Sequence, residues 1–334
     1  MSRRPIAVVL VFANLTPARL HCQAHRTHLY PSLGTLTTSV TSTPHPRLRI
    51  AAIDFLNPAP LMWDFEHPPL AAPLALRYQI DRMTPSECAS RLATGQADIG
   101  LIPIAALAAN PALRILPGCT IASKTRVRSL LLVHRANRPP AALRSVAADT
   151  ASRTTVAYAR ILFHKWGNPD VPFIPAAANL DAMLATADAA IVIGDPALLA
   201  LEDQANRFER THEELVYIDL AEAWTSQTGV PFVSAVWGIA CSGPLEGKIA
   251  DDMLRSRDHG LQNIDALAAE WAQRLPLSAE AIRAYLTTNI HYILDKECIE
   301  GMEVFFRTAA SLGVLPAYTP SFAESASEWR VSRR

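Results

Sequence analysis

Short apolar runs alternate with amphipathic stretches along most of this chain, which is the order of strands and helices in an α/β protein. The first group of runs predicts strands at residues 48–56, 74–80, 98–102, 115–121 and 129–133. Their continuous apolar character is typical of parallel strands that are covered on both faces. Between them, Thr84-Pro85-Ser86-Glu87 predicts the start of a helix that ends near Gly95. Thr and Glu three residues apart form a capping box, and Pro suits the first helical position.

A second group of elements follows the break at Asn137-Arg-Pro-Pro140. We expect strands at 146–148, 171–174, 189–193 and 233–241, with helices after Ser152 and at 180–187. The C-terminal third, from about Leu245 to Gly313, has helical spacing throughout and is predicted to contain no strand.

This order predicts two α/β domains between which the chain crosses twice. A chain of 334 residues is too long for one small core. The C-terminal helices have no sheet of their own, so we expect them to cover the first sheet. Domain I then comprises residues 47–135 and 238–325, domain II comprises residues 136–237, and the crossings lie near 133–138 and 233–238. This is the two-lobed architecture of periplasmic-binding-type proteins, in which ligands bind in the cleft at the carboxyl ends of strands.

Residues 1–46 differ from the rest of the chain. Ser, Thr, Pro and His are dense from Leu15 to Pro46, and hydrophobic periodicity is absent. The start combines basic residues with an apolar run of minimal signal-peptide length, without a clear cleavage site. That run is far too short to span a bilayer. We interpret residues 1–46 as a disordered extension or as the product of an upstream start codon.

Composition narrows the class of protein. Half of the residues are hydrophobic and 19% are charged, which is ordinary for a soluble globular protein. The formal net charge is zero and the pI is about 7.2, so no basic field favours nucleic acid or an anionic membrane surface. The cysteines are scattered and form no Cys-x-x-Cys pair, which favours free thiols in a reducing, cytoplasmic compartment. No metal-ligand cluster and no carboxylate dyad stands out.

The turn before the helix at Ser152 is the first candidate for a binding site. The stretch Asp149-Thr150-Ala151-Ser152-Arg153-Thr154-Thr155 lies between an apolar run and a helical pattern. Ser152 is the expected N-cap, with its hydroxyl accepting from backbone N–H groups of the first turn. A helix start with free N–H groups, several hydroxyls and one guanidinium suits a carboxylate ligand. The alternative is an ordinary capped helix with an exposed Arg153.

Several stretches, in one order along the chain, resemble the chorismate dehydratases of the futalosine route to menaquinone. They are Ile53-Asp-Phe-Leu-Asn57-Pro-Ala-Pro-Leu61, Val127-Arg-Ser129-Leu, Thr150-Ala-Ser-Arg-Thr-Thr155-Val, Ile193-Gly-Asp195 and Thr228-Gly-Val-Pro-Phe232-Val. The resemblance covers roughly residues 47–320, and the 46-residue head departs from the family pattern. A sibling of the same pathway, 1,4-dihydroxy-6-naphthoate synthase, shares the fold but typically opens with a Ser-Pro-Cys-Pro-Asn-Asp-like run. This chain has Asp-Phe-Leu-Asn-Pro there, which favours the dehydratase.

The resemblance implies that chorismate loses water to give 3-[(1-carboxyvinyl)oxy]benzoate. The C3 proton and the C4 hydroxyl leave as the ring becomes aromatic. Aromatisation supplies the driving force, so the protein mainly positions the substrate and places charge. No cofactor and no metal are implied, and the suggested base is the enolpyruvyl carboxylate of the substrate itself. We expect a monomer or homodimer that takes a small molecule, with no nucleic-acid or membrane partner.

The same resemblance gives the expected site. Asn57 and Ser129 are expected to be catalytic and to face the turn across the cleft; the expected substrate-binding residues are Ser152, Arg153, Thr154, Thr155 and Asp195. Each also has a plainer alternative: Asn57 as a turn residue, Ser129 as a core hydroxyl and Asp195 as a helix cap with Pro196 after it. His134, His291, Trp224 and Trp237 are expected to have structural roles.

Three functions remain open at this point. The first is a lyase acting on chorismate, and the second is the sibling naphthoate synthase. The third is a non-catalytic solute-binding protein, which the two-lobed fold alone allows.

Overall fold

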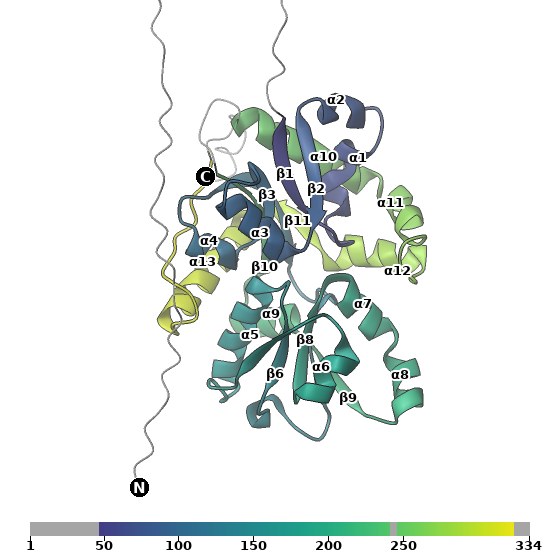
Figure 1. The fold of residues 1–334 in the computed structure, drawn as a ribbon, viewed down its shortest axis with the longest axis vertical. Helices are drawn as coiled ribbons and strands as arrows, with labels where there is room; N and C mark the ends of the chain where they lie inside the picture. The colour runs from purple at the N-terminus through teal and green to yellow at the C-terminus, as the bar shows by residue number, and fades with distance from the viewer. Residues whose placement is uncertain (1–46, 241–245, 324–334) are drawn as a thin grey trace, which may run out of the picture. The chain divides into compact units, whose positions relative to one another are not determined.

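The computed structural model describes residues 47–240 and 246–323. The expectations for residues 1–46, for the end of the strand predicted to reach 241 and for the last two residues of domain I lie outside this range. The described strands form two sheets, one of six strands and one of five (Figure 1).

The six-stranded sheet has the order β11-β4-β10-β3-β1-β2. Its strands are β1 (Leu48–Ile53), β2 (Tyr78–Met83), β3 (Ile99–Pro103), β4 (Arg114–Ser123), β10 (Phe232–Ile239) and β11 (His291–Leu294). The helices that accompany it are η1 (Ala59–Met62), α1 (Trp63–Glu66), α2 (Ala71–Ala75), α3 (Pro85–Ala93), α4 (Ala105–Ala109), α10 (Glu246–Gln262), α11 (Ile264–Trp271), α12 (Ala279–Ala284), the π-helical turn η3 (Tyr285–Asn289) and α13 (Lys296–Ser311). We call this unit lobe I.

The five-stranded sheet has the order β7-β6-β8-β5-β9. Its strands are β5 (Leu130–Arg135), β6 (Val146–Asp149), β7 (Phe173–Ala176), β8 (Ala189–Ile193) and β9 (Leu215–Asp219). The helices are η2 (Pro140–Ala142), α5 (Arg153–Lys165), α6 (Leu180–Thr186), α7 (Gly194–Glu202), α8 (Gln204–Thr211) and α9 (Leu220–Thr228). We call this unit lobe II.

The predicted two-lobed fold is confirmed, and many elements lie where the pattern placed them. The predicted capping box is present, since Thr84 accepts a hydrogen bond from the Glu87 N–H and Glu87 accepts one from the Thr84 N–H. Two expectations are wrong. The apolar run from Leu74 begins inside α2 rather than in a strand, because periodicity alone does not separate a short buried helix from a strand. The C-terminal third contributes one strand, β11, to the edge of the first sheet.

Strand pairing also moves the predicted crossings. β5 pairs with β8 and β9 in lobe II, so the first crossing lies between Ser123 and Leu130 rather than near 133–138. β10 pairs with β3 and β4 in lobe I, so the chain returns between Asp219 and Phe232, by way of α9, rather than near 233–238. Both strands run antiparallel to their neighbours, so the sheets are mixed rather than parallel. The hydrophobic pattern located these strands but carried no information about their partners.

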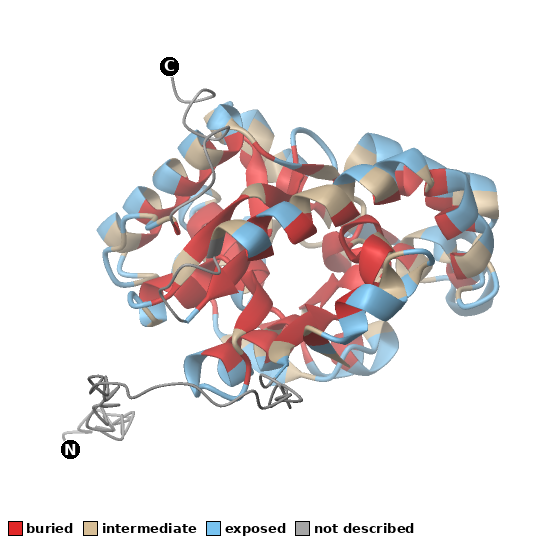
Figure 2. Cartoon of the chain, turned by 90° about the horizontal axis from the view of Figure 1, so that it is seen from above, coloured by how far each residue is buried: buried red, intermediate tan, exposed pale blue. Residues whose placement is uncertain are grey.

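One buried hydrophobic cluster extends through both lobes. At its centre the Tyr158 ring of α5 stacks on Phe232 of β10 at 3.9 Å and on Phe305 of α13 at 4.1 Å, with Trp224 of α9 at its edge. Figure 2 shows the same buried interior along both sheets. Trp224 and Trp237 are fully buried, which confirms their expected role in packing.

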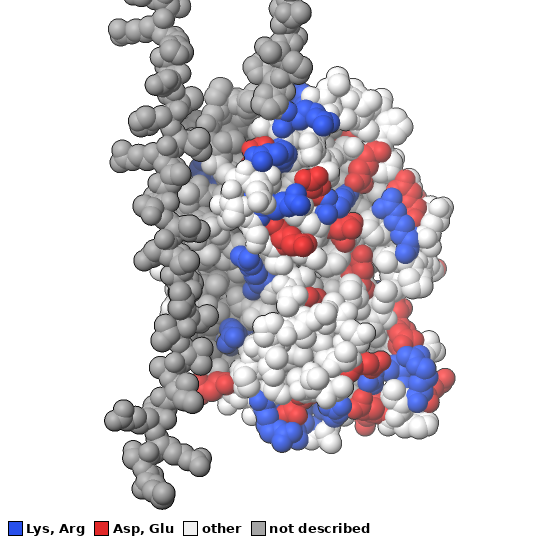
Figure 3. Space-filling view, in the orientation of Figure 1, with Lys and Arg blue, Asp and Glu red and all other residues white. Residues whose placement is uncertain are grey.

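The surface of the described residues shows no membrane-spanning helix and, on one face, a mixture of charges. No helix among the described residues is long and apolar enough to cross a membrane. On the face shown in Figure 3, acidic and basic side chains are interspersed rather than gathered into one field. This mixture agrees with the zero formal net charge.

Candidate functional site

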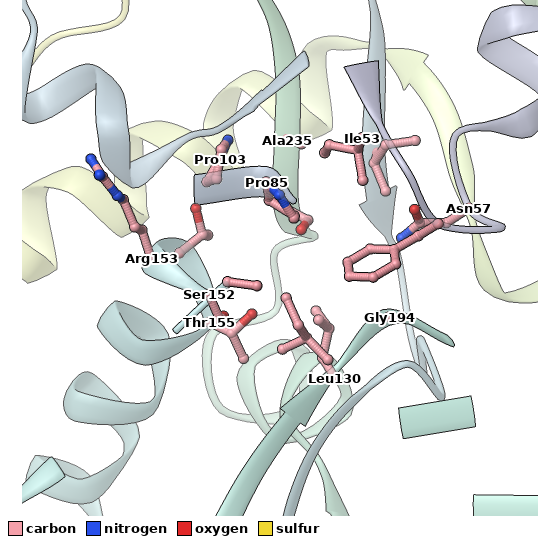
Figure 4. A pocket seen from close by; sticks show the side chains of 16 residues that line it. Ile53, Asn57, Pro85, Pro103, Leu130, Ser152, Arg153, Thr155, Gly194 and Ala235 are labelled. Carbon is pink, nitrogen blue, oxygen red and sulfur yellow. The ribbon is translucent and has the colours of Figure 1, made fainter. Parts of the chain in front are cut away.

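A cavity lies between the lobes, at the carboxyl ends of β1, β3, β6 and β8 (Figure 4). This is the place at which open α/β sheets bind ligands. The residues that line it are Ile53, Phe55, Asn57, Pro85, Pro103, Ile121, Leu130, Ala151, Ser152, Arg153, Thr154, Thr155, Ile193, Gly194, Ser234 and Ala235. Five of the seven expected site residues are therefore gathered around one space. The other two, Ser129 and Asp195, do not line the cavity, but each is next in the chain to a residue that does, Leu130 or Gly194.

The lobe II wall is the turn from β6 into α5. The Asp149 carboxylate accepts from the Ala151 N–H at 2.9 Å, and the Asp149 carbonyl accepts from the Ser152 N–H at 3.0 Å. An Asp side chain that bonds its own backbone two residues on makes a compact turn. Ser152 therefore sits at the N-cap, as predicted, but its side chain makes no capping bond. Its hydroxyl oxygen is instead buried with no hydrogen-bond partner in the protein, an arrangement that calls for a ligand or ordered water.

Other side chains of this turn bond across the cleft to lobe I. The Thr154 hydroxyl accepts from the Ala105 N–H at the start of α4, at 3.1 Å. Arg153 is exposed, and its guanidinium donates to the Ser90 hydroxyl of α3 at 3.1 Å. In Figure 4 this guanidinium points away from the centre of the cavity. Thr155 is buried and lines the cavity.

The lobe I wall is the loop that follows β1. Asn57 closes this loop, and the Tyr292 hydroxyl of β11 donates to its main-chain carbonyl at 3.0 Å. The side-chain oxygen of Asn57 is buried and has no hydrogen-bond partner in the protein. The loop is thus fixed through its backbone, while the amide oxygen of Asn57 stays free for a ligand.

Asp195 joins the two walls. The alternative role of Asp195 as a helix cap is wrong, since α7 begins at Gly194 and has no side-chain cap. Its carboxylate accepts from the Leu56 N–H of lobe I at 2.9 Å. Gly194 has φ +64°, and an added Cβ would lie 2.6 Å from the Phe55 ring, so only glycine fits this contact. Burial raises the pKa of Asp195, the Leu56 bond lowers it and the nearby Asp54 raises it, and together they bring it to about 6.

Ser129 lies on the first crossing, directly before β5, and is fully buried. Its hydroxyl accepts from the Tyr285 hydroxyl at 2.8 Å, and its carbonyl accepts from the Gly194 N–H at 2.8 Å. Sequence reasoning missed the parts played by Phe55, Tyr285 and Tyr292. The helical spacing that includes Tyr285 was visible in the sequence, but spacing does not tell which buried hydroxyl a tyrosine will meet.

The cavity as it stands has a volume of about 30 Å³. That is room for one or two water molecules, since one water needs roughly 10–15 Å³. A six-membered ring does not fit in this volume. Among the described residues that line the cavity, Arg153 is the one charged side chain.

A group of possible metal ligands lies elsewhere, at the junction of β11 and α13. His291, Asp295 and Cys298 each bring a ligand atom within 4.8 Å of the others, a cluster that the sequence did not reveal. Asp295 already accepts from the Cys298 N–H at 2.9 Å and pairs with Lys124 at 2.9 Å. Burial raises the pKa of the Cys298 thiol, which disfavours the thiolate that a metal needs. We assign no metal to this group.

The fold and the interlobe cavity define a two-lobed α/β protein of the periplasmic-binding type. A Candida albicans protein described as having the generic periplasmic-binding-protein fold has 15% identity to this chain, covering 85% of this chain and 100% of its own, with a TM-score of 0.57. The protein AF1704 from Archaeoglobus fulgidus has 14% identity, covering 80% and 98%, with a TM-score of 0.61. At these identities the likeness shows the fold alone.

Sequence comparison identifies the family. A family model described as menaquinone biosynthesis matches residues 48–311, and the chain belongs to this family. A curated relative, the chorismate dehydratase of Thermus thermophilus, is 26% identical over 251 residues, which covers 73% of this chain and 90% of the relative. A role in menaquinone biosynthesis follows at the level of the family.

Proposed function

We propose that this protein is a lyase that removes water from chorismate to give 3-[(1-carboxyvinyl)oxy]benzoate. The observation that carries the proposal is the pair of buried, unpartnered oxygens, Asn57 Oδ1 and Ser152 Oγ, on opposite walls of one cavity. The similarity to the Thermus chorismate dehydratase supports the choice of substrate. Buried polar groups without partners are rare in native proteins, so two that line the same space favour a polar ligand there.

The lobe II turn suits one substrate carboxylate. The N–H groups at the start of α5 and the hydroxyls of Ser152 and Thr155 line the cavity. Arg153 stands at its edge and would turn from Ser90 toward the ligand. Such donors hold an anion through charge-assisted hydrogen bonds.

The lobe I loop suits the reacting part of the ring. As C3 loses its proton and the C4 hydroxyl departs, charge develops on the ring and on the leaving oxygen. The Asn57 amide has both a donor and an acceptor, so it can stabilise that charge or hold the hydroxyl in place. Among the described lining residues no carboxylate and no imidazole is present. This supports the enolpyruvyl carboxylate of the substrate as the group that takes the C3 proton.

The small cavity adds a requirement for motion. Chorismate enters only if the lobes separate about the two crossings, which breaks the bonds of Arg153, Thr154 and Asp195 across the cleft. Closure over the substrate then excludes water from the ring, which strengthens every electrostatic contact inside.

The test is incubation of purified protein with chorismate, followed by separation and mass analysis of the products. The expected product is the aromatic carboxyvinyloxy acid, lighter than chorismate by one water. Binding of chorismate without any change to it would favour a solute-binding protein. No binding and no turnover would overturn the substrate, and the sibling naphthoate synthase would then be tested with its own substrate.

A further inference from the structure

A pair of buried, hydrogen-bonded hydroxyls, Tyr285 and Ser129, lies next to the residues that line the cavity. Tyr285, the first residue of the π-helical turn η3, is 2% exposed and donates to the Ser129 hydroxyl at 2.8 Å. Four residues on, the Asn289 side chain donates to the Arg126 carbonyl at 3.0 Å. The turn is thus fixed to the first crossing at two points. Single π-helical turns recur at functional sites, and this one connects the C-terminal third of the chain to the first crossing.

The state of the Tyr285 hydroxyl follows from its surroundings. Burial raises the pKa of Tyr285, while the Ser129 hydroxyl and the Asn57 side chain lower it by hydrogen bonding. The balance keeps the phenol neutral, so it donates. Because its proton goes to Ser129 Oγ, the Ser129 hydroxyl is left to donate its own proton in another direction.

The position of Tyr285 separates it from the substrate. Neither Tyr285 nor Ser129 lines the cavity, whereas Asn57 does. Tyr285 is therefore placed to act on a ligand through Ser129, to which its hydroxyl is bonded, and not by direct contact.

We propose that Tyr285 is a positioning residue, whose hydroxyl holds the Ser129 hydroxyl in the direction that the substrate requires. The proposal rests on the proposed dehydration of chorismate. It adds to that function a residue from the C-terminal third of the chain, outside the five short stretches named above for the resemblance. Positioning matters here because small misplacements of reacting groups cost much of the rate.

The first experiment is Tyr285→Phe, which keeps the ring and removes the hydroxyl. We expect kcat for chorismate to fall about 10-fold, the size of one net hydrogen bond, with KM within about twofold of wild type. Tyr318→Phe is the matched control, because its hydroxyl also has a protein partner, the Ser321 N–H at 3.4 Å, but that partner is not one of the expected site residues. It should leave kcat unchanged.

The second experiment separates positioning from general stability. If Tyr285 acts through Ser129, adding Tyr285→Phe to Ser129→Ala should change little. The double variant should have a kcat within about twofold of that of Ser129→Ala alone. Losses that multiply fully would overturn the proposal. Should Tyr285→Phe fail to unfold cooperatively, Ser129→Ala decides alone: kcat within about twofold of wild type would show that the positioned hydroxyl does nothing. A wild-type protein that leaves chorismate unchanged overturns both proposals, whereas an active wild type with multiplying losses overturns this one alone.

Discussion

The two walls of the cavity are built in different ways. On the lobe I side, the loop after β1 is fixed within its own lobe by the Tyr292 hydroxyl on the Asn57 carbonyl. On the lobe II side, the hydroxyl of Ser152 has no partner, and the side chain of Arg153 is exposed. The backbone of the lobe I loop is held from behind by a side chain of its own lobe, whereas the side chains of Arg153 and Thr154 on the lobe II wall bond across the cleft.

This difference indicates a division of labour. Groups that act on bond changes are most effective when they are fixed before the substrate arrives. Groups that gather a carboxylate can exchange weak contacts for strong ones as the lobes close. We therefore expect changes in the lobe I wall to lower kcat and changes in the lobe II wall to weaken substrate binding.

The largest effect is expected from Asn57→Ala. Removing a fixed polar group beside the reacting ring should lower kcat by about 100- to 1,000-fold, with a smaller change in KM. Steady-state kinetics with chorismate measure both values. Asn110→Ala is a control, because the Asn110 side chain bonds only the Ala106 carbonyl within lobe I and should leave both unchanged. A rise in KM at constant kcat would place Asn57 with the binding groups instead.

Arg153→Ala tests the other wall. Loss of a charge-assisted bond, worth roughly 1.5–3 kcal/mol, should lower kcat/KM about 10- to 150-fold. Arg153→Lys should recover part of the loss, because an ammonium cannot reproduce the planar fork. Protein stability should change little, since the side chain is exposed.

Ser90→Ala is the matched control for Arg153. It removes the present partner of the guanidinium and leaves the charge free to meet a substrate. We expect kcat/KM to stay within about threefold of wild type. If Ser90→Ala reproduced the Arg153→Ala loss, the bond between the lobes, rather than a carboxylate contact, would be the function of Arg153.

The sequence predicted the two-lobed fold, the capping box at Thr84 and the turn at Ser152, because each depends on local patterns. It misplaced the two crossings, since the partners of β5 and β10 are decided by packing between distant segments. The extra strand β11 was hidden for a similar reason, because four residues inside a long helical region carry little periodic signal.

The sequence predicted residues that the structure gathers around one cavity, but it did not predict their contacts. Five expected residues line one cavity, yet the Ser152 hydroxyl makes no cap and Asp195 bonds the opposite lobe. Tyr285 escaped prediction because its partner lies 156 positions away in the chain. Long-range hydrogen bonds of buried hydroxyls leave no trace in spacing or composition.

Asp195→Asn tests the contact that joins the two walls. Burial raises the pKa of Asp195 from 3.8 to about 6, so the folded protein binds this proton more tightly than the unfolded chain. Its favourable contribution is complete below about pH 4 and is lost as the pH rises to about 6. Asparagine keeps an acceptor for the Leu56 N–H without the charge. The variant should therefore be more stable than wild type at pH 7.5, by about 1–3 kcal/mol.

Thermal unfolding at several pH values measures the difference in stability between Asp195→Asn and wild type, which should shrink toward pH 4. Asp188→Asn provides a control of opposite sign, because the hydrogen bonds of Arg144, with Arg138, lower the pKa of Asp188. That variant should be less stable than wild type at neutral pH, and the loss should fade as the pH falls through the lowered pKa. A stability gap for Asp195→Asn that does not depend on pH would contradict the buried, charged state of Asp195.

The smallest effect is expected from Ser152→Ala. An N-cap serine that makes its capping bond contributes about 1 kcal/mol to stability, but the Ser152 hydroxyl makes none. We therefore expect the free energy of unfolding to stay within about 0.5 kcal/mol of wild type. The affinity for substrate should fall about three- to tenfold, because the only bond that the variant loses is the one between the Ser152 hydroxyl and the ligand.

Ser278→Ala makes this result interpretable. Ser278 caps α12 and accepts from the Ala281 N–H at 3.1 Å, so the variant should lose about 1 kcal/mol of stability without any change in affinity. The two serines thus occupy the same position in their helices and should give opposite results in the two assays. If Ser152→Ala lost stability as Ser278→Ala does and kept its affinity, the free hydroxyl would be an ordinary cap. The lobe II wall would then have no group reserved for the substrate besides Arg153 and the threonines, and the contrast between the walls would weaken to a difference in exposure.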